Sequence, residues 1–436
     1  MGPLEHRVLV PPGGGGVLEF VAAGECDADA VVATVSGVGI GLFTEWPVRV
    51  PRPYRARRGE VEPLNTGQRV LDLLYPIARG STAAVPGGFG TGKTMLLQQL
   101  AKWCDADVIV YIGCGERGNE LAEIVAELLD LADPRTGGRL ADRTVVIANT
   151  SNMPMMAREA SIYTGAAVAE YFRDMGHHVV VIADSTSRWA EALREFASRT
   201  GALPAEEGYP ADLASALAAF YERAGAVETL GGSTGSVTIV GAVSPPGGDM
   251  TEPVTAQTER FVRARWTLDR DLAYARHYPA VSWSNSFSRD ATAIGAHHER
   301  VDDRGWSGRR ARVMGLLAEE DRLTALAELV GATALSGPER VVLLGGRLLR
   351  EGVLQQNAQS SVDAYCGSAK TGALVDAVLA VVDECRELVG AGLPAASVEE
   401  FDFSGLIRLR EDADPHDVGV VDRCRKSVLA GLRGLT

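Results

Sequence analysis

Short apolar runs alternate with longer amphipathic stretches through the middle of this 436-residue chain. The runs have the length and the β-branched content of buried strands, and the stretches between them repeat apolar positions at helical spacing. This alternation predicts an α/β domain in which helices cover both faces of a parallel sheet. The expected strands are 83–87, 107–112, 144–148, 178–184 and 236–244, and the clearest expected helices are 93–103 and 120–131.

The pattern changes on either side of this core. After about residue 290 the strand signal fades, and helical periodicity continues in residues 313–330, 339–356 and 371–389. The first 62 residues are rich in glycine, proline and valine, which predicts short strands and turns. We therefore expect a short β segment, an α/β domain and a C-terminal helical domain, with the boundaries 1–62, 63–290 and 291–436.

Composition argues against several classes of protein. The formal net charge of −14 disfavours non-specific nucleic-acid binding, which needs a basic face. No apolar run reaches the ~18–20 residues of a membrane span, so we expect no direct membrane insertion. The six cysteines are scattered without a CxxC pair, and the seven histidines have no HExxH spacing. The cysteine pattern is typical of reduced cytosolic thiols rather than of a disulfide framework or a zinc site, so we expect a cytoplasmic chain.

The segment GGFGTGKT fits the phosphate-binding pattern G-x-x-x-x-G-K-[ST]. It lies between an expected strand and an expected helix, which is the context that the motif requires. Backbone N–H groups of such a loop close around phosphates, and the N-terminus of the next helix adds a favourable dipole. The alternative is a chance glycine-rich turn. The predicted nucleotide-binding residues are Gly87, Gly88, Phe89, Gly90, Thr91, Gly92, Lys93 and Thr94.

Lys93 is one of four lysines in a chain that has 39 arginines. A compact ammonium fits a tight phosphate loop better than the broad fork of arginine, so we expect Lys93 to contact the β and γ phosphates. The Thr94 hydroxyl would ligate Mg²⁺. Asp184 ends the expected strand 178–184 as in a Walker B strand, and its carboxylate would hold the Mg²⁺ shell. The alternative for Asp184 is a turn or helix-capping role.

Glu116 stands in GCGERGNE, directly after the expected strand 107–112. In a doubly wound sheet ligands bind at the carboxyl ends of the strands, so the loop after this strand could bring Glu116 to a γ-phosphate. A carboxylate there would orient an attacking water and accept its proton. The alternative is a structural ion pair. Arg117 could bind the same phosphate or pair with Glu120.

These motifs together resemble the catalytic A subunit of the V-type and archaeal-type rotary ATPases. The flagellar-type export ATPases and the F-type β subunit share the phosphate loop and the GER triplet, but not GCGERGNE together with ADSTSRW. The non-catalytic B subunit lacks an intact phosphate loop. The segments that carry the resemblance are GGFGTGKT, VYIGCGERGNE, NTSNMPMMAREASIYTG, ADSTSRWAEALRE, PAEEGYPADLASALAAFYERAG and GAVSPPGGDMTEPV.

The resemblance implies roles for matching residues. Residues 87–94 would bind ATP or ADP with Mg²⁺, and Thr94 and Asp184 would serve the metal. Tyr278 matches an aromatic residue that stacks on adenine. Arg188 would lie near the γ-phosphate, although a salt bridge to a nearby carboxylate is an equal alternative. The implied catalytic residues are Lys93, Glu116, Arg117 and Arg188.

The resemblance also implies a function and partners. The chain would hydrolyse or synthesise ATP in a rotary pump that moves protons or sodium ions across a membrane. Its partners would be a non-catalytic B subunit in an alternating hexamer, a central stalk and membrane ion-translocating subunits, through which it would be peripheral to the membrane. Two alternatives stay open: a stand-alone hexameric motor of the export-ATPase type, and a degenerate subunit that binds nucleotide with little turnover.

Three departures from the family pattern are visible. The chain begins within the tail of the domain inserted in the family, so the family's N-terminal β-barrel is not in this sequence; truncation and real loss both fit. Aromatic residues expected beside adenine are replaced by Val353 and, nearby, by Gln359. Stacking on a base is worth ~1–3 kcal/mol, so ATP should bind about ten- to a hundredfold less tightly. Residues 293–310 do not align with the family.

Overall fold

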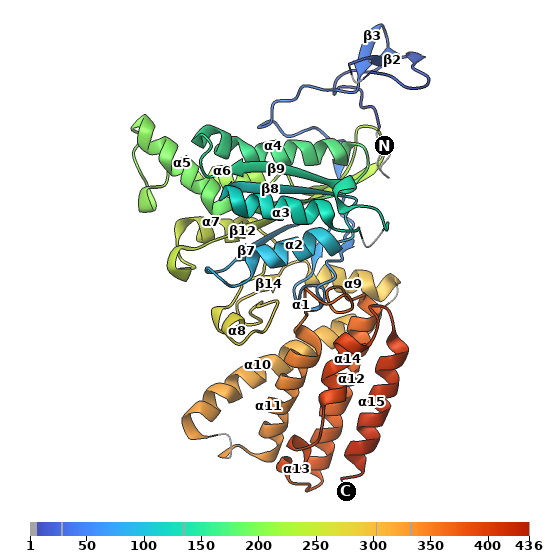
Figure 1. Cartoon of the computed structure of the whole chain (residues 1–436), viewed down its shortest axis with the longest axis vertical. Helices are drawn as coiled ribbons and strands as arrows, with labels where there is room; N and C mark the ends of the chain where they lie inside the picture. Colours follow the sequence, from blue (N-terminus) through green and yellow to red (C-terminus); the bar gives the residue numbers. More distant parts are fainter. Residues whose placement is uncertain (1–6, 28, 134–135, 302, 332–333, 436) are drawn as a thin grey trace. The chain divides into compact units, whose positions relative to one another are not determined.

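The structure is a computed structural model that describes residues 7–27, 29–133, 136–301, 303–331 and 334–435 (Figure 1). The chain divides into two compact units that do not follow sequence order. The first comprises residues 1–61, 78–86 and 105–263, and the second comprises 62–77, 87–104 and 264–436. The boundaries expected near residues 62 and 290 stay predictions.

A parallel sheet organises the first unit. Its strands are, in spatial order, β7 (Thr82–Pro86), β12 (Thr234–Val243), β10 (His178–Asp184), β8 (Val108–Glu116) and β9 (Thr144–Thr150). Each pairs in parallel with its neighbour. The central strands are buried along almost their whole length, as in a sheet covered on both sides. The expected α/β fold is confirmed.

Two helices show how both faces of this sheet are covered. Ile112 and Gly113 are neighbours on β8, so the side chain of Ile112 and a Cβ on Gly113 would point to opposite faces of the sheet. A Cβ on Gly113 would lie 2.5 Å from Leu121 of α3 (Gly118–Asp130). Ile112 instead packs against Gly165 of α4 (Met155–Asp174). Figure 1 accordingly shows α4 and α3 on either side of β8 and β9.

Shorter elements complete the first unit. The strands β11 (Gly225–Glu228) and β4 (Ala56–Arg57) extend the sheet in antiparallel fashion beside β12. The short strands expected near the start of the chain form a separate antiparallel sheet of β1 (Leu18–Val21), β2 (Val31–Val35) and β3 (Val38–Gly41). The remaining α-helices are α5 (Thr186–Thr200), α6 (Leu213–Tyr221) and α7 (Pro253–Phe261).

Helices dominate the second unit, which confirms the expected C-terminal helical region. One expectation needs correction: residues 339–356 do not form a single α-helix, because α11 ends at Leu349 and continues as a π-helical turn, Arg350–Leu354. Arg69 donates hydrogen bonds to the carbonyls of Val353 and Gln355 at this end. These bonds satisfy carbonyls that a longer α-helix would bond to its own N–H groups. The short strands are β5 (Pro63–Leu64), β6 (Ile77–Ala78, at the boundary between the units), β13 (Ala264–Arg265) and β14 (Phe287–Ser288). The α-helices are α1 (Arg69–Leu74), α2 (Lys93–Trp103), α8 (Arg270–Tyr274), α9 (Ala291–Val301), α10 (Trp306–Val330), α11 (Gly337–Leu349), α12 (Ser368–Gly390), α13 (Ala395–Glu399), α14 (Ser404–Asp412) and α15 (Val418–Arg433).

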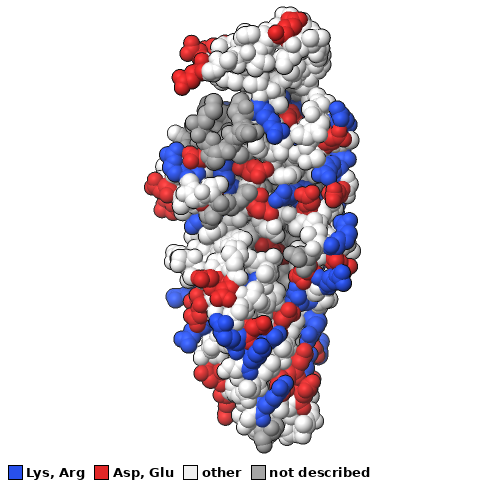
Figure 2. Space-filling view, turned by 90° about the vertical axis from the view of Figure 1, so that its right-hand side faces the viewer, with Lys and Arg blue, Asp and Glu red and all other residues white. Residues whose placement is uncertain are grey.

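The surface mixes charges of both signs. On the face that Figure 2 shows, acidic and basic side chains are interspersed rather than gathered into the single basic stripe typical of nucleic-acid binding. Within the part of the chain that the structure describes, no helix has both the length and the apolar character that a bilayer span requires.

A buried ion pair fixes α4 within the first unit. Glu170 on α4 accepts two hydrogen bonds from Arg223, at 2.9 and 2.6 Å, and both side chains are 1% exposed. The same carboxylate accepts the backbone N–H of Arg52 at 2.9 Å. Because the charge is both paired and hydrogen-bonded, its burial is tolerated, whereas removing one partner would leave the other uncompensated.

We expect Glu170→Ala to lower the free energy of unfolding by about 3–5 kcal/mol, because Arg223 would be left buried and unpaired. Glu195→Ala is the matched control, since it removes the exposed pair between Glu195 and Arg199 on α5. That change should cost less than ~1 kcal/mol. Denaturant unfolding of the purified variants measures both effects, and equal losses would contradict a special role for the buried pair.

Candidate functional site

The phosphate loop follows β7 in the chain and leads into α2. Gly90 and Gly92 have φ values of +78° and +88°, a left-handed conformation that glycine adopts without strain. Thr91 is buried, and its hydroxyl donates to the carbonyl of Gly88 at 2.9 Å, which closes the turn. Gly92 is the N-cap residue of α2 and has no side chain to cap the helix. This helix end is therefore suited to a bound anion.

Lys93 holds its ammonium group inside the same loop. Its Nζ donates to the carbonyls of Gly87 at 2.6 Å and Gly88 at 2.9 Å. Thr94 lies beside it on the first turn of α2, with its side chain exposed. The side chain of Phe89 is fully exposed. The loop thus offers a cation and a hydroxyl on one short segment, which is the arrangement that a nucleotide phosphate with Mg²⁺ requires.

Tyr278 lies beside the last glycine of the loop. A Cβ on Gly92 would be 3.3 Å from the Tyr278 ring, which is 40% exposed. Next to them is a pocket of about 500 Å³, a volume usual for small-molecule sites. Its lining residues are Gly92, Met95, Arg276, Tyr278, Gln355, Gln356, Asn357, Ala358, Gln359, Arg410 and Glu411.

The lining of this pocket bears on the prediction that Val353 and Gln359 replace aromatic residues beside adenine. Gln359 does line it, but Val353 is fully buried and does not. Arg410 and Glu411 come from α14, and sequence reasoning missed both. Arg410 is held by Asp363 through a 2.6 Å hydrogen bond, and Asp363 also pairs with buried Arg69 at 2.7 Å.

A signal for this part of the pocket was present in the sequence. Lys370 is another of the four lysines, and it is completely buried. Its Nζ donates to the carbonyls of Arg410 at 2.8 Å and Ala413 at 2.6 Å, so it fixes the end of α14. A buried ammonium that serves backbone carbonyls explains the lysine, but only the fold reveals which carbonyls these are.

Glu116 is the last residue of β8, which corrects the expectation that it lies in a loop after the strand. Pairing with β9 continues past the expected end of the strand: Cys114 is opposite Asn149, and Glu116 is opposite Thr150. The extra residue is Gly115, which forms a β-bulge with a φ of +70°. Such bulges change the direction of the next side chain and are frequent beside active sites.

Arg188 of α5 contacts both residues at this bulge. Its Nε lies 3.1 Å from Oε1 of Glu116, and its Nη1 donates to the carbonyl of Gly115 at 2.9 Å. The Glu116 side chain is only 12% exposed. Burial, with the nearby charge of Asp184 adding to it, raises the pKa of Glu116 to about 7, although Arg188 opposes the shift. A carboxyl group with a pKa near the working pH is suited to general-base catalysis.

Asp184 ends β10 on the strand next to β8. It is 5% exposed, and its Oδ2 accepts a hydrogen bond from the Tyr111 hydroxyl at 3.1 Å. Burial raises the pKa of Tyr111, so the phenol stays a protonated donor. A carboxylate is one of the hard oxygen ligands that Mg²⁺ prefers, with phosphates and water filling the other positions. Asp184 and the Thr94 hydroxyl therefore have the right donor chemistry for this metal.

Three of the predicted residues belong to neighbouring elements of the first unit. Arg188 forms a salt bridge with Glu116, which sequence reasoning kept as an alternative, and Asp184 ends the strand next to that of Glu116. Arg117 likewise pairs with Glu120 at 3.2 Å and is 71% exposed. The phosphate loop and Tyr278 belong to the second unit.

Comparisons with known proteins give the family. Residues 67–288 match the model of the ATP synthase alpha/beta family, nucleotide-binding domain, and residues 295–391 match the C-terminal domain of V and A type ATP synthase. The second match includes residues 295–310, so the expectation that residues 293–310 depart from the family is wrong for that part. The V-type ATP synthase alpha chain of Nitrosococcus oceani is 52% identical over 397 residues, which cover 90% of this chain and 67% of that protein. The chain belongs to the A-subunit family of V-type and A-type ATP synthases.

Other relatives agree with this assignment. The A-type ATP synthase A-subunit of Methanopyrus kandleri is 49% identical over 409 residues, 92% of this chain and 69% of that protein. Among solved structures, a type III secretion ATPase of pathogenic bacteria has a TM-score of 0.62 at 24% identity, covering 82% of this chain and 94% of its own. An ATP synthase subunit from Nanoarcheaum equitans has a TM-score of 0.66 at 20% identity, covering 82% and 83%. These two likenesses show the fold alone, and the A-subunit resemblance read from the motifs is confirmed by the sequence relatives.

The pKa of Glu116 gives a prediction about pH. Only the ionised carboxylate can accept a proton, so turnover in the assembled enzyme should rise with pH, with a midpoint near the Glu116 pKa of about 7. Arg188→Gln removes the cation that lowers this pKa, so the midpoint should move to higher pH. Arg194→Gln, which removes a cation over the Tyr209 ring further along α5, should leave it in place. The pH dependence of kcat/KM, which reports groups of the free enzyme, is the measurement, and an unmoved midpoint in Arg188→Gln would contradict this electrostatic coupling.

Proposed function

We propose that this A-subunit family member hydrolyses or synthesises ATP as the catalytic subunit of a rotary ATPase that transports protons or sodium ions across a membrane. The observation that carries the proposal is Glu116: a nearly buried carboxyl group with a pKa of about 7, aimed by a bulge at the carboxyl edge of the sheet and paired with Arg188. The family membership names the reaction, and this geometry supplies a residue able to perform its proton transfer.

The residues of this chain divide the work. The phosphate loop and Lys93 hold the β and γ phosphates. Tyr278 stacks on the adenine ring in the adjoining pocket. Glu116 orients the attacking water and accepts its proton during hydrolysis, and it returns the proton during synthesis. Asp184 and Thr94 would hold Mg²⁺, which, when bound with the nucleotide, neutralises charge on the phosphates. Arg117, whose exposed side chain pairs with Glu120, would contact the same phosphate when nucleotide is bound.

Arg188 has two consecutive roles in this scheme. While Glu116 is ionised, the ion pair between the two residues helps to keep it so, because the cation lowers its pKa. Once Glu116 accepts the proton, the attraction between the two side chains is lost. The guanidinium is then available to the negative charge on the transferred phosphate, where a cation stabilises the transition state. Proton acceptance and charge stabilisation are thereby linked.

As a member of an ATP synthase family, the chain works within a complex of several different chains. We propose that a non-catalytic B subunit completes the site with an arginine in an alternating hexamer. The central stalk and membrane ion-translocating subunits would keep the chain peripheral to the membrane on the cytoplasmic side. No observation favours a stand-alone motor or a degenerate subunit, since the secretion ATPase is similar in fold alone.

Nucleotide binding gives the first test. Lys93→Ala removes the ammonium from the phosphate loop, so most affinity for MgATP should be lost. Lys102→Ala is the matched control, because Lys102 lies on the same helix with its ammonium over the Trp103 ring. Calorimetric titration of both variants measures the effect. Wild-type affinity in Lys93→Ala would refute the phosphate-loop assignment.

Partner dependence gives the second test. An arginine supplied in trans to a transferred phosphate is worth about 10³–10⁵ in rate, so this chain alone should show little ATPase activity. Activity should appear when a B-type subunit is added, and it should rise with the concentration of that partner until assembly is complete. The measurement is ATPase rate against partner concentration, with light scattering to follow assembly. Strong turnover by the chain alone as a homohexamer would instead favour the stand-alone motor.

A further inference from the structure

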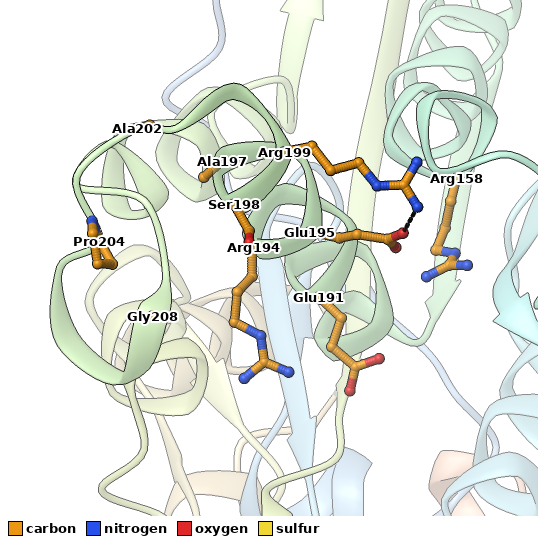
Figure 3. Close-up of a pocket in the computed structure, with 10 residues that line it drawn as sticks. All are labelled: Arg158, Glu191, Arg194, Glu195, Ala197, Ser198, Arg199, Ala202, Pro204 and Gly208. Carbon is orange, nitrogen blue, oxygen red and sulfur yellow. Dashed lines mark hydrogen bonds and ion pairs between the residues drawn. The ribbon is translucent and has the colours of Figure 1, made fainter.

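Arg158 of α4 is a charged residue that the scheme above does not use. It forms one wall of a surface pocket of about 760 Å³, whose other walls come from α5 and the segment after it (Figure 3). Arg158 lies in the first turn of a 20-residue helix, where the helix dipole disfavours a positive charge. The position of Arg158 on α4 is therefore unfavourable for a cation. The contacts of its side chain explain why an arginine occupies it.

The stem of Arg158 packs against the bulge that carries Glu116. Its Cδ and Nε lie 3.1 and 3.3 Å from the position that a Cβ would take on Gly115. The Cβ of Arg188 lies 3.3 Å from the same position. Two arginine side chains thus close the space around Gly115, and neither the space nor the φ of +70° admits a larger residue.

Hydrogen bonds tie Arg158 to both sides of the bulge. Its Nη2 donates to the carbonyl of Ser151 at 3.2 Å, and the Ser151 N–H donates to the carbonyl of Glu116 at 2.8 Å. On the other side of Gly115, the thiol of Cys114 approaches the Arg158 carbonyl at 3.6 Å. The residues before and after Gly115 are therefore both linked to Arg158, one directly and one through Ser151.

The bulge changes the face of the sheet to which the side chains of β8 point. In a regular strand Gly113 and Gly115 would point to the same face. A Cβ on Gly113 would meet Leu121 of α3, whereas a Cβ on Gly115 would meet Arg158 of α4, on the opposite face. The alternation is therefore broken at Gly115, immediately before Glu116, and the direction of Glu116 depends on whatever holds Gly115 in place.

We propose that Arg158 is a positioning residue for ATP turnover: by packing on Gly115 it holds the bulge in the conformation that aims the Glu116 carboxylate at the reacting water. The inference rests on the proposed role of Glu116 as general base. The Nε of Arg158 is buried without a hydrogen-bond partner among the described residues. A buried N–H without a partner costs free energy, so no hydrogen bond of the Nε explains its position. The packing of the Arg158 side chain against Gly115 does explain it.

The test is steady-state ATPase kinetics of the assembled complex. Arg158→Ala empties the space beside Gly115, and a displacement of ~1 Å at a reacting group can cost about 10²-fold in rate. We expect kcat to fall about 10- to 100-fold with KM for MgATP unchanged. Arg158→Met keeps an unbranched stem against Gly115 and should recover most of the rate. Arg194→Ala, from the same pocket but extending from α5 over Tyr209, should keep wild-type kcat (Figure 3).

A double-mutant cycle shows whether Arg158 acts through Glu116. In the Glu116→Gln background, Arg158→Ala should cause no further loss, because residues that act as one unit are not additive. A full additional loss would overturn the inference. Wild-type kcat in Arg158→Ala, or a Met variant as slow as the Ala variant, would overturn it as well. If the Ala variant does not assemble, Arg158→Gln, which shortens the stem, takes its place.

The same experiment separates this inference from the proposed function. If Glu116→Gln lowers turnover while Arg158→Ala does not, Glu116 remains the base and only the role of Arg158 fails. If Glu116→Gln keeps wild-type turnover, the proposed role of Glu116 is wrong, and the role of Arg158 fails with it.

Discussion

The register between β8 and β10 is the constraint on which the proposed catalytic edge of the first unit depends. Asp184 is opposite Gly113, so β8 extends beyond β10 by the three residues that include the bulge and Glu116. Parallel strands end at the same edge of a sheet, and this register therefore places two carboxylates near each other while leaving Glu116 further out. A slip of one residue would turn every side chain of β8 to the other face. The continuous apolar burial of both strands prevents such a slip.

Arginine–carboxylate pairs stabilise both units. The planar guanidinium group explains why these pairs use arginine rather than lysine. Arg223 holds Glu170 through two nitrogen atoms in the first unit, and Asp363 receives both Arg69 and Arg410 in the second. A guanidinium can bind a carboxylate through two parallel hydrogen bonds, which an ammonium cannot do. Lysine is kept where a point charge serves converging carbonyls, as at Lys93 and Lys370.

The sequence predicted the features that depend on local pattern. Strand 178–184 and helix 93–103 match the structure to the residue, because their apolar periodicity and their ends are both explicit. The bulge at Gly115 was missed, since pairing with β9 extends the strand through glycines that have weak strand preference. Arg410 was missed as well, because 47 residues separate it from Asp363 and no local pattern marks the pair. Sequence reasoning named Glu116, but could not show what aims it.

The ion pair between Glu116 and Arg188 raises the question whether Glu116 is structural or chemical, and the direction of its pKa shift supports the proposed chemical role. A structural salt bridge lowers the pKa of its carboxyl group, yet that of Glu116 rises from an ordinary 4.5 to about 7, because burial and Asp184 outweigh Arg188. Between these two pH values the folded chain holds a proton that the unfolded chain has released, so stability falls as pH rises through this window. At neutral pH the ionised pair is therefore a cost to the fold rather than a support. A carboxylate kept at such a cost, at the carboxyl edge of the sheet and on a bulge closed by two arginines, agrees with the proposed role of Glu116 as general base.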